Sequence, residues 1–323
     1  MTDITIVLLN WNSYPIVLDA AVSALAQQDV SVDLVVVDNG SNDGSLAKMR
    51  ERYPQLRIIE MGWNSGFTGG MNAGTDAARG EFVLWQNADL LLAEDYCARA
   101  VATMRADSTI GAVGGTVYRL VDGQRSTEFD AAGYTLRPTH RARFVTHRRD
   151  QDVVGVSGSC PIFRREALDS LRAPVGYILE PWYFAYGEDI DVMLRLNLAG
   201  WRVRYIADMV AWHVRSGSTA PASRFYQKPD HIQVHHFKNR VATIVKAIPR
   251  SAMLTRLPAL IATELGMPFY LLLRRPKSIR NWARAWHQLW RERRRLLRDR
   301  VAIQEKATSH NVARLQTLLA RTD

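Results

Sequence analysis

Several acidic residues stand where a carboxylate could hold a cation or move a proton. Asp38 and Asp89 each follow a short apolar run, and Asp189 lies in an acidic stretch at 188–191. Carboxylates bind hard divalent cations, accept hydrogen bonds from a ligand, or take a proton from a reacting hydroxyl. A structural role is the alternative, because acidic residues also cap helices and complement the helix dipole. For Asp89 such a cap would precede residues 90–92.

A second set of candidate residues is basic. His213 ends an apolar run and is followed by Arg215 and a loop of Ser, Gly and Thr. An imidazole can complete a metal shell or contact a phosphate, and a guanidinium pairs with phosphate. A single histidine can equally be structural. The chain has no GxxxxGK[ST] loop and no GxGxxG that opens a helix after the first apolar run, which disfavours a P-loop or Rossmann dinucleotide site.

The elements that must position these residues follow from the hydrophobic pattern. Over the first ninety residues, apolar runs typical of buried strands alternate with segments of helical spacing. The strands are expected at 5–9, 32–37, 56–59 and 82–85, and the helices at 15–28, 45–52 and 70–78. This alternation predicts a layered α/β sheet with right-handed crossovers, whose ligands lie beyond the carboxyl ends of the strands. Asp38 and Asp89 stand at two such ends.

The middle of the chain is less regular. Residues 113–117 predict another strand, whereas 119–152 are rich in loops, Arg and His. That segment could be a mobile cover that grips phosphate or a solvated insertion. The small residues of 154–163 would let backbone approach a ligand closely. The residues after Tyr186 predict a helix that ends near Gly200, so the acidic stretch lies in its first turn.

Five short motifs, in their order along the chain, carry a family resemblance. Each is weak alone, but their order and spacing are specific. They are Val7-Leu8-Leu9-Asn10-Trp11-Asn12; residues 35–45, which include Asp38-Asn39-Gly40-Ser41; Asn64-Ser65-Gly66-Phe67 with Gly70-Met71-Asn72-Ala73-Gly74; Asn87-Ala88-Asp89; and Gly187-Glu188-Asp189-Ile190-Asp191 with His213. Over roughly residues 4–219, the chain resembles the inverting family 2 glycosyltransferases, and among them rhamnosyltransferase-like members that build bacterial cell-surface glycans.

The resemblance implies a fold and a reaction. The fold would be α/β, the GT-A nucleotide-diphospho-sugar transferase fold, with a mostly parallel central sheet flanked by helices. Asp189 would be the catalytic base that deprotonates the acceptor hydroxyl, so that the sugar is transferred with inversion. A divalent metal, Mg²⁺ or Mn²⁺, would bridge the phosphates, with Asp89 and His213 as ligands. The nucleotide-sugar would be bound by Asn10, Asn12, Asp38, Ser41, Asn64, Gly66, Asn72, Asn87, Asp89 and Arg215.

The metal motif departs from the wider family in one respect. Two acids often flank one residue there, whereas here the first position is Asn87. Related rhamnosyltransferase-like sequences also carry Asn at this place. Because one anionic ligand is missing, weak metal affinity is expected.

The substrates follow from the resemblance rather than from the composition. A dTDP-activated L-rhamnose is the first candidate donor and a UDP-sugar the second, and the acceptor would be a hydroxyl of a lipid-linked glycan. Two other classes compete with a glycosyltransferase. One is a nucleic-acid-binding protein with a degenerate catalytic body, and the other is a nucleotidyltransferase, which lacks support because no basic glycine-rich loop follows the first strand.

Length and composition are those of an ordinary globular protein. The chain has 323 residues, of which 47% are hydrophobic and 23% charged, enough for one large domain with an appendage or for two domains. Its two cysteines exclude a disulfide scaffold or a cysteine-based zinc site and favour a reducing compartment. The first residues lack the basic and long apolar parts of a signal peptide. We therefore expect a cytoplasmic protein.

The net charge of +10 is unevenly distributed. Residues 224–323 carry 21 Lys and Arg against 6 Asp and Glu, whereas residues 1–223 carry 21 against 26. We therefore divide the chain into a catalytic domain, 1–223, and a basic helical region, 224–323. Such a region seeks polyanions, either nucleic acid or an anionic membrane surface.

The C-terminal region has the pattern of a membrane-surface helix. Residues 279–301 combine eight arginines with Trp282, Trp286, Leu289 and Trp290, whose spacing places the apolar side chains on one helical face. Residues 252–273 are apolar but are interrupted by two prolines and two charged residues, so no spanning helix is expected. We predict peripheral attachment to the inner face of the cell membrane. The alternative is a helical hairpin that packs on the catalytic domain or on a dimer partner.

Overall fold

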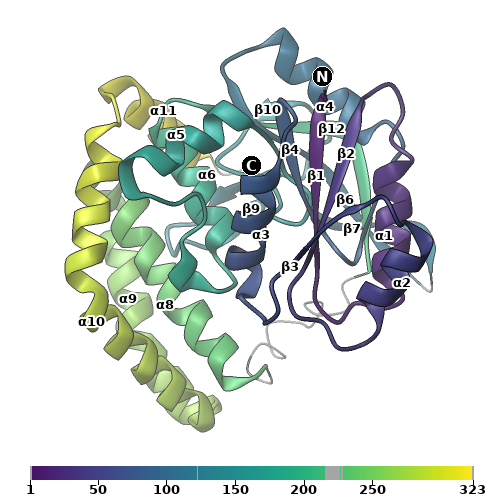
Figure 1. The fold of residues 1–323 in the computed structure, drawn as a ribbon. Helices are drawn as coiled ribbons and strands as arrows, with labels where there is room; N and C mark the ends of the chain where they lie inside the picture. Colours follow the sequence, from purple (N-terminus) through teal and green to yellow (C-terminus); the bar gives the residue numbers. More distant parts are fainter. Residues whose placement is uncertain (1, 122, 215–225, 227, 322–323) are drawn as a thin grey trace.

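The first half of the molecule is a parallel β–α repeat. The computed structural model describes residues 2–121, 123–214, 226 and 228–321. The repeat consists of β1 (Ile4–Asn10), α1 (Ile16–Leu25), β2 (Val32–Asp38), α2 (Ser45–Arg52), β3 (Arg57–Glu60), α3 (Gly66–Ala77) and β4 (Phe82–Asn87). β1 lies between β2 and β4 and is parallel to both, and β3 pairs in parallel with the other edge of β2 (Figure 1). The predicted alternation is confirmed. α3 begins four residues earlier than expected because its first turn is rich in glycine, a weak helix former.

The second half of the sheet is mixed. Its elements are β5 (Leu90–Leu92), α4 (Tyr96–Ala106), β6 (Ile110–Val121), β7 (Gln124–Ala131), β8 (Tyr134–Leu136), β9 (Ala142–Phe144), β10 (Gln151–Asp152), β11 (Ile162–Arg164), α5 (Arg165–Val175), the 3-10 turn η1 (Pro181–Tyr183), α6 (Glu188–Leu198) and β12 (Arg202–His213). Among the described residues, the spatial order of the sheet is β10-β12-β6-β11-β4-β1-β2-β3, with β5 beside β12 and β7 beside β6. β8 and β9 pair apart from it.

Two expectations for this half are wrong. Residues 90–92 form β5, antiparallel to the end of β12, so Asp89 does not cap a helix there. The segment 119–152, expected to be loop-rich, contains the end of β6 and the four strands β7 to β10. The hydrophobic pattern did not predict β7 because most of its side chains are exposed. Antiparallel strands need only one buried face.

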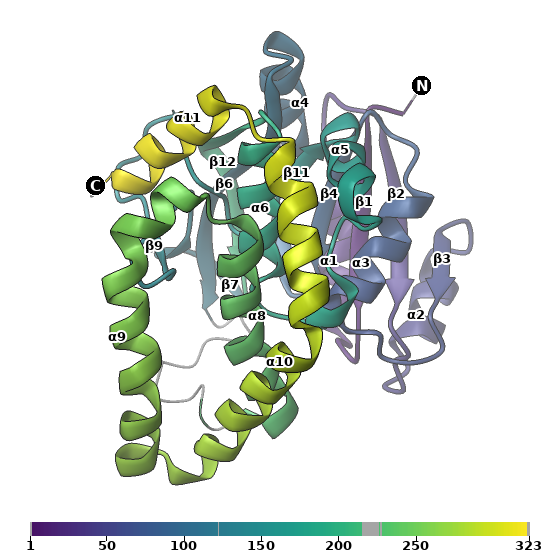
Figure 2. The ribbon, with the colours of Figure 1, turned by 90° about the vertical axis from the view of Figure 1, so that its left-hand side faces the viewer.

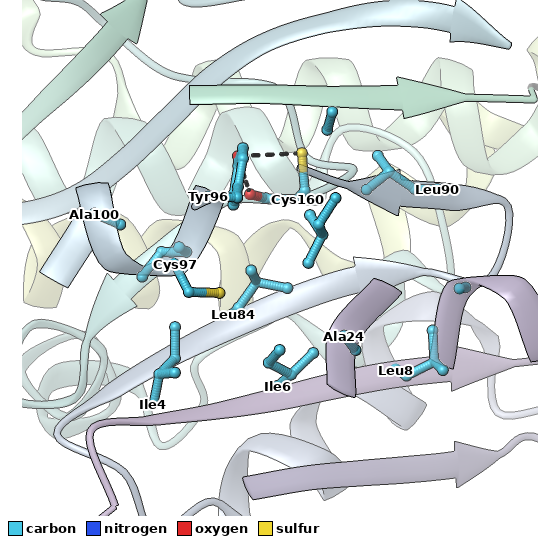
Figure 3. Close-up of a cluster of buried hydrophobic side chains, with 14 of the residues drawn as sticks. Ile4, Ile6, Leu8, Ala24, Leu84, Leu90, Tyr96, Cys97, Ala100 and Cys160 are labelled. Atoms are coloured by element: carbon cyan, nitrogen blue, oxygen red, sulfur yellow. Dashed lines mark hydrogen bonds between the residues drawn. The ribbon is translucent and has the colours of Figure 1, made fainter. Parts of the chain in front are cut away.

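The two faces of the sheet bury separate cores. Ile4, Ile6 and Leu8 of β1 point to the face covered by α1 and α4, whereas Val7 points to the face covered by α3, α5 and α6. Figure 3 shows the first of these cores, with the β1 side chains beside residues of α4. Cys97 and Cys160 lie in it as free thiols. Fully buried apolar side chains at this alternation fix the register of β1 and therefore the place where its carboxyl end emerges.

The C-terminal helices share a core with the sheet domain. They are α8 (Asp230–Ala247), α9 (Arg250–Arg274), α10 (Pro276–Glu305) and α11 (Ser309–Ala320). Figure 2 shows α8 between α9 and α10, and α8 packs on α6 while α10 also contacts α5. One apolar cluster joins Leu194 of α6 to Ile244, Ile303 and Leu315. These helices are thus built into the molecule, and the boundary predicted at 223 falls within a range that is not described.

Residues 252–273, in which no spanning helix was expected, form most of α9. It runs through both prolines as one helix. The two charged residues do not interrupt its outer surface because both point inward: Arg256 donates to the carbonyl groups of Leu136, Arg137 and Leu319, and Glu264 pairs with Arg240. By length and composition alone, α9 is the one described helix that could cross a membrane, and 17% of its apolar window is buried.

The predicted tryptophan face of α10 is divided between two environments. Leu289 is buried in a cluster with Ala242 of α8, and Trp282 packs against Leu271 of α9. Trp290 is 65% exposed and Trp286 is 38% exposed. Packing on α8 and α9 therefore uses part of the face predicted for membrane contact, which agrees in part with the alternative of helices packed on the catalytic domain.

Candidate active site

A cleft of about 520 Å³ opens at the carboxyl ends of β1, β2 and β4. Segments far apart in the sequence form its walls. They include Trp11, Asn39, Asn64, Gly66, Phe67, Asn87, Asp89, Ser157–Ser159, Phe184–Tyr186, Glu188–Ile190 and His213. The structure thus brings Asp89 and Asp189 to one cleft, together with four other residues singled out in the sequence (Asn64, Gly66, Asn87 and His213).

Asp38 lies beneath the cleft rather than on its wall. Its carboxylate is buried and accepts hydrogen bonds from Asn10 Nδ2 at 2.9 Å and from the backbone N–H of Ser41 at 3.1 Å. Asn10 Nδ2 is also within 2.8 Å of Ser45 Oγ. The three predicted nucleotide-binding residues Asn10, Asp38 and Ser41 are therefore brought together, and their mutual bonds fix the turn that follows β2.

The turn after β1 presents an aromatic side chain. Asn12 has a positive φ of 49°, and its Oδ1 accepts a hydrogen bond from the backbone N–H of Asn42 at 2.8 Å. Trp11, just before it, is 52% exposed and lines the cleft. The sequence placed Trp11 in a motif without giving it a role. An exposed indole beside a polar pocket offers a flat surface on which a nucleobase can stack.

Hydrogen bonds of Asn39 join the turn after β2 to the start of α3. Asn39 Nδ2 donates to Asn64 Oδ1 at 3.2 Å and to the carbonyl group of Gly66 at 3.0 Å. Gly66 has φ +76°, and a Cβ there would lie 2.5 Å from the carbonyl oxygen of Phe184. Glycine is required at this close approach.

Asn72 departs from its predicted position. It does not line the cleft, and its side-chain amide donates to the carbonyl group of Leu179 at 2.9 Å and accepts from the N–H of Leu179 at 3.0 Å. Asn72 therefore braces the segment that leads to η1. Its motif is in the right region, since Gly66 and Phe67 at the start of α3 line the cleft, but Asn72 lies further along the helix and does not.

A histidine between two carboxylates forms one end of the cleft. His213 Nε2 lies 3.0 Å from Asp89 Oδ1, and His213 Nδ1 lies 3.3 Å from Asp130 Oδ2. Burial lowers the pKa of His213, but hydrogen bonds to Asp130 and Asp89 and their negative charges outweigh it, so the pKa is raised overall. Asp130 was not identified from the sequence, because it lies near the end of a segment with the polar pattern of an exposed loop. Only the pairing of β7 with β6 brings Asp130 next to His213.

Asp89 and His213 are suitable ligands for a divalent cation, but two side chains do not complete its coordination shell. Asp89 offers a hard carboxylate oxygen and His213 a ring nitrogen, both on the cleft wall. Within the described residues, no set of three or more His, Cys, Asp or Glu side chains has the arrangement of a full metal site. Arg215, also predicted to contact phosphate, lies outside the described residues.

Glu188 and Asp189 form the other end of the cleft, at the start of α6. Burial raises the pKa of Asp189, and burial together with the charge of Asp189 raises the pKa of Glu188 to about 8. Gly158 makes room for the Asp189 side chain, since a Cβ there would lie 2.7 Å from Asp189 Cβ. The N–H of Ile190 donates to Asp189 Oδ1 at 2.9 Å. A carboxylate whose pKa is raised is a stronger base once ionised.

The loop of residues 184–187, which we call the catalytic loop, precedes these carboxylates and is held by α8. Phe184, Tyr186 and Gly187 all have positive φ values, a conformation that persists only when neighbouring groups enforce it. Asn239 Nδ2 lies within 3.0 Å of the carbonyl oxygens of Tyr183, Ala185 and Tyr186. Sequence reasoning missed Asn239 because it lies in the region assigned to the membrane.

An ionic network fixes α8 itself. The ammonium group of Lys246 is buried 3.1 Å from Asp191 and 3.3 Å from Glu180. Arg195 pairs with Asp191 at 3.2 Å, also without solvent contact. Asp191, one of the acidic residues of the 188–191 stretch, therefore has a structural role. Breaking such a pair would leave an uncompensated buried charge, which is strongly destabilising.

Comparison with known proteins agrees with this architecture. The model of the family described as Glycosyl transferase family 2 matches residues 5–172, about half of the chain. The chain belongs to glycosyl transferase family 2. Its GT-A fold and glycosyltransferase class, expected from the five motifs, are confirmed.

Two bacterial relatives illustrate this similarity. The glycosyltransferase is 28% identical over 235 residues to "Succinoglycan biosynthesis protein ExoO" of Rhizobium meliloti, a match that spans 71% of this chain and 65% of that protein. It is 27% identical over 246 residues to "N-acetylglucosaminyl-diphospho-decaprenol L-rhamnosyltransferase" of Mycobacterium tuberculosis, spanning 67% of this chain and 75% of that one. The match thus spans slightly less than two thirds of the rhizobial relative.

Solved structures share the fold at low sequence identity. GalNAc-T7, solved with UDP, GalNAc and Mn²⁺, superposes with a TM-score of 0.61 and 14% identity over 77% of this chain and 49% of that chain. The Pyrobaculum calidifontis mannosyltransferase PcManGT, solved with GDP-Man and Mn²⁺, gives a TM-score of 0.52 and 19% identity over 99% of this chain and 87% of that chain.

Proposed function

We propose that this glycosyltransferase transfers L-rhamnose from dTDP-rhamnose to a hydroxyl of a lipid-linked glycan, with inversion, in the synthesis of a cell-surface polysaccharide. The observation that carries the proposal is the convergence of Asp89, His213 and Asp189 on one cleft. The name of the mycobacterial relative, a rhamnosyltransferase acting on a decaprenol-linked acceptor, supports this donor and acceptor. A UDP-sugar is the second candidate donor.

The nucleotide would lie between the turns that follow β1 and β2. Trp11 offers its exposed ring to the base, and the buried unit of Asn10, Asp38 and Ser41 holds the turn that faces it. Asn39 and Asn64 present amide groups beside Gly66, where backbone can approach a ribose or phosphate closely. Asn87 lines the same wall next to Asp89.

A divalent ion would lie beside the diphosphate of the donor. Asp89 and His213 would hold it, and the diphosphate of the donor would supply further oxygen ligands. Both solved neighbours named above contain Mn²⁺. When bound, the ion offsets the charge that grows on the departing nucleoside diphosphate. Asp130 orients His213 from behind, in the way that carboxylates fix metal-binding imidazoles.

Asp189 would act as the general base. It takes the proton of the acceptor hydroxyl while that oxygen attacks the anomeric carbon, and the bond to the nucleoside diphosphate breaks on the opposite face. The electron pair of the broken bond leaves with the diphosphate, so the configuration at the anomeric carbon inverts. The raised pKa of Asp189, caused by burial, increases its affinity for the proton.

Membrane attachment at the cytoplasmic leaflet completes the proposal. The outward side of α9 is largely apolar, with Leu254, Leu265, Phe269 and Leu273 between 65% and 80% exposed. Exposed basic residues, Arg274, Lys277 and Arg280, lie where α9 ends and α10 begins, and each adds about 1 kcal/mol of attraction near an anionic leaflet. An exposed apolar surface of this kind favours lipid over nucleic acid as the partner of the basic region.

The test compares donor binding with transfer. Asp189→Asn should bind the donor with wild-type affinity in calorimetry and lose at least about 100-fold in transfer, because a general base contributes 10²–10⁴-fold. Asp208→Asn, an exposed carboxylate, is the matched control. A screen of dTDP-, UDP- and GDP-sugars by nucleotide release identifies the donor. If Asp189→Asn kept the turnover of the wild type, Asp189 would not be the general base.

A further inference from the structure

A second cavity, of about 870 Å³, adjoins the donor cleft. It lies between the end of the catalytic loop and helices α8 and α9. Three lining residues belong to both spaces, namely Ala142, Tyr186 and Ile190. Ile190 directly follows Asp189, so a molecule in the second cavity can extend a hydroxyl to the base without entering the donor side.

The polar wall of this cavity is cationic. Among its described lining residues are Arg141, Arg240 and Arg275, and none is a carboxylate. Glu264, behind the wall, pairs with Arg240, so the three guanidinium groups keep an excess of two positive charges. The cavity therefore complements a ligand that carries two or more negative charges.

Two of the three arginines, Arg240 and Arg275, are held in place by neighbouring groups. Arg240 donates to the carbonyl group of Thr139 at 3.1 Å, and the guanidinium carbon of Arg275 lies 5.5 Å from the centre of the Tyr226 ring. Burial, followed by the charges of Arg240 and Arg141, lowers the pKa of His236 to about 4. Positively charged, partly pre-positioned guanidinium groups are well suited to phosphate oxygens.

The opposite wall is apolar and continues to the outer surface. Gly266 and Met267 of α9 line the cavity, while Leu265 and Phe269 of the same helix point outward and are 65% and 69% exposed. One turn of α9 thus separates the cationic cavity from an apolar surface. A ligand with a charged head and a long apolar chain matches both.

We propose that the second cavity binds the diphosphate of an isoprenoid-linked acceptor, with Arg141, Arg240 and Arg275 on the phosphates and the lipid chain leaving along α9. The inference rests on the proposed function and extends it by assigning the acceptor a site of its own. The donor and the acceptor phosphates then occupy opposite sides of Asp189, and the glycan hydroxyl reaches the base between them.

Farnesyl diphosphate is a suitable probe for the full-length protein in detergent micelles. Calorimetry should show binding to the wild type, and Arg141→Gln and Arg275→Gln should each weaken it by about tenfold, the loss of one charge-assisted hydrogen bond. Arg149→Gln, an exposed arginine outside the cavity lining, should leave the affinity unchanged. Farnesol, which lacks the phosphates, should bind weakly and equally to all variants.

A competition experiment locates the probe. dTDP and farnesyl diphosphate should bind together, and dTDP affinity should be the same in every arginine variant. Displacement of farnesyl diphosphate by dTDP would place the probe in the donor cleft and overturn the inference, as would an affinity that ignores both arginines or an absence of binding to the wild type. Failure of the proposed function shows separately, as an absence of nucleotide-sugar binding or turnover.

Discussion

Asn239→Ala tests whether α8 positions the catalytic loop. Asn239 Nδ2 lies 2.9, 3.0 and 2.7 Å from the carbonyl oxygens of Tyr183, Ala185 and Tyr186, and the side chain is fully buried. Its two amide hydrogens serve three acceptors, and its Oδ1 accepts a hydrogen bond from the buried ammonium group of Lys238 at 3.0 Å. Truncation therefore removes about three hydrogen bonds and roughly 3 kcal/mol of unfolding free energy. In a chain of this length the melting temperature falls by about 4 °C.

The larger effect should be on catalysis. Without the amide, the positive φ values of Phe184 and Tyr186 lose their support, and the loop before Asp189 can relax. A displacement of about 1 Å at a reacting group costs about 100-fold in rate. We therefore expect kcat, measured as nucleoside diphosphate release at saturating substrates, to fall by about 100-fold, with donor affinity near that of the wild type.

Asn281→Ala is the matched control. Asn281 is also a buried asparagine of the C-terminal helices, and its Nδ2 donates to Asp230 at 2.8 Å and to Gln233 at 3.4 Å, away from the cleft. It should lose about 2 kcal/mol of unfolding free energy, measured by thermal denaturation, and keep its kcat. If Asn239→Ala also kept the wild-type kcat, the positioning role of Asn239 would be refuted.

Three further predictions concern charge, membrane and metal. The raised pKa of Glu188, about 8, means that its stabilising contribution is complete below the pKa of the unfolded side chain and is lost as pH rises through 8. Urea denaturation should show the wild type losing at least about 1 kcal/mol more than Glu188→Gln between about pH 5 and 9; identical losses would contradict the assignment. Leu265→Asp with Phe269→Asp should weaken flotation with anionic liposomes at least about 100-fold, while Val121→Asp, on the sheet, should not; unchanged flotation would exclude α9 as the anchor. Excess chelator should abolish transfer and Mg²⁺ or Mn²⁺ should restore it, whereas full activity in chelator would remove the ion from the mechanism.

The sequence predicted much of the site because the relevant information is local. Apolar runs alternating with helical spacing define β1, β2 and β4, and polar residues directly after parallel strands must gather at one edge. Asp89 and Asn87 are therefore found where they were expected. The acidic stretch at the start of α6 was located equally well. The residue pattern did not separate Asp189, which only the family resemblance singled out, from Asp191, which the structure buries against Lys246.

Contacts between segments that are distant in the chain could not be predicted from the sequence. Asp130 reaches His213 only through the pairing of β7 with β6, and Asn239 reaches the catalytic loop only because α8 packs beside α6. The same holds for α9, whose Arg256 and Glu264 interrupted an apolar run in the sequence. In the folded chain both turn inward to partners more than twenty residues away, which leaves an apolar outer face. Local periodicity determined which segments form helices and strands, whereas the side on which a charge is buried depended on where its partner came to lie in three dimensions.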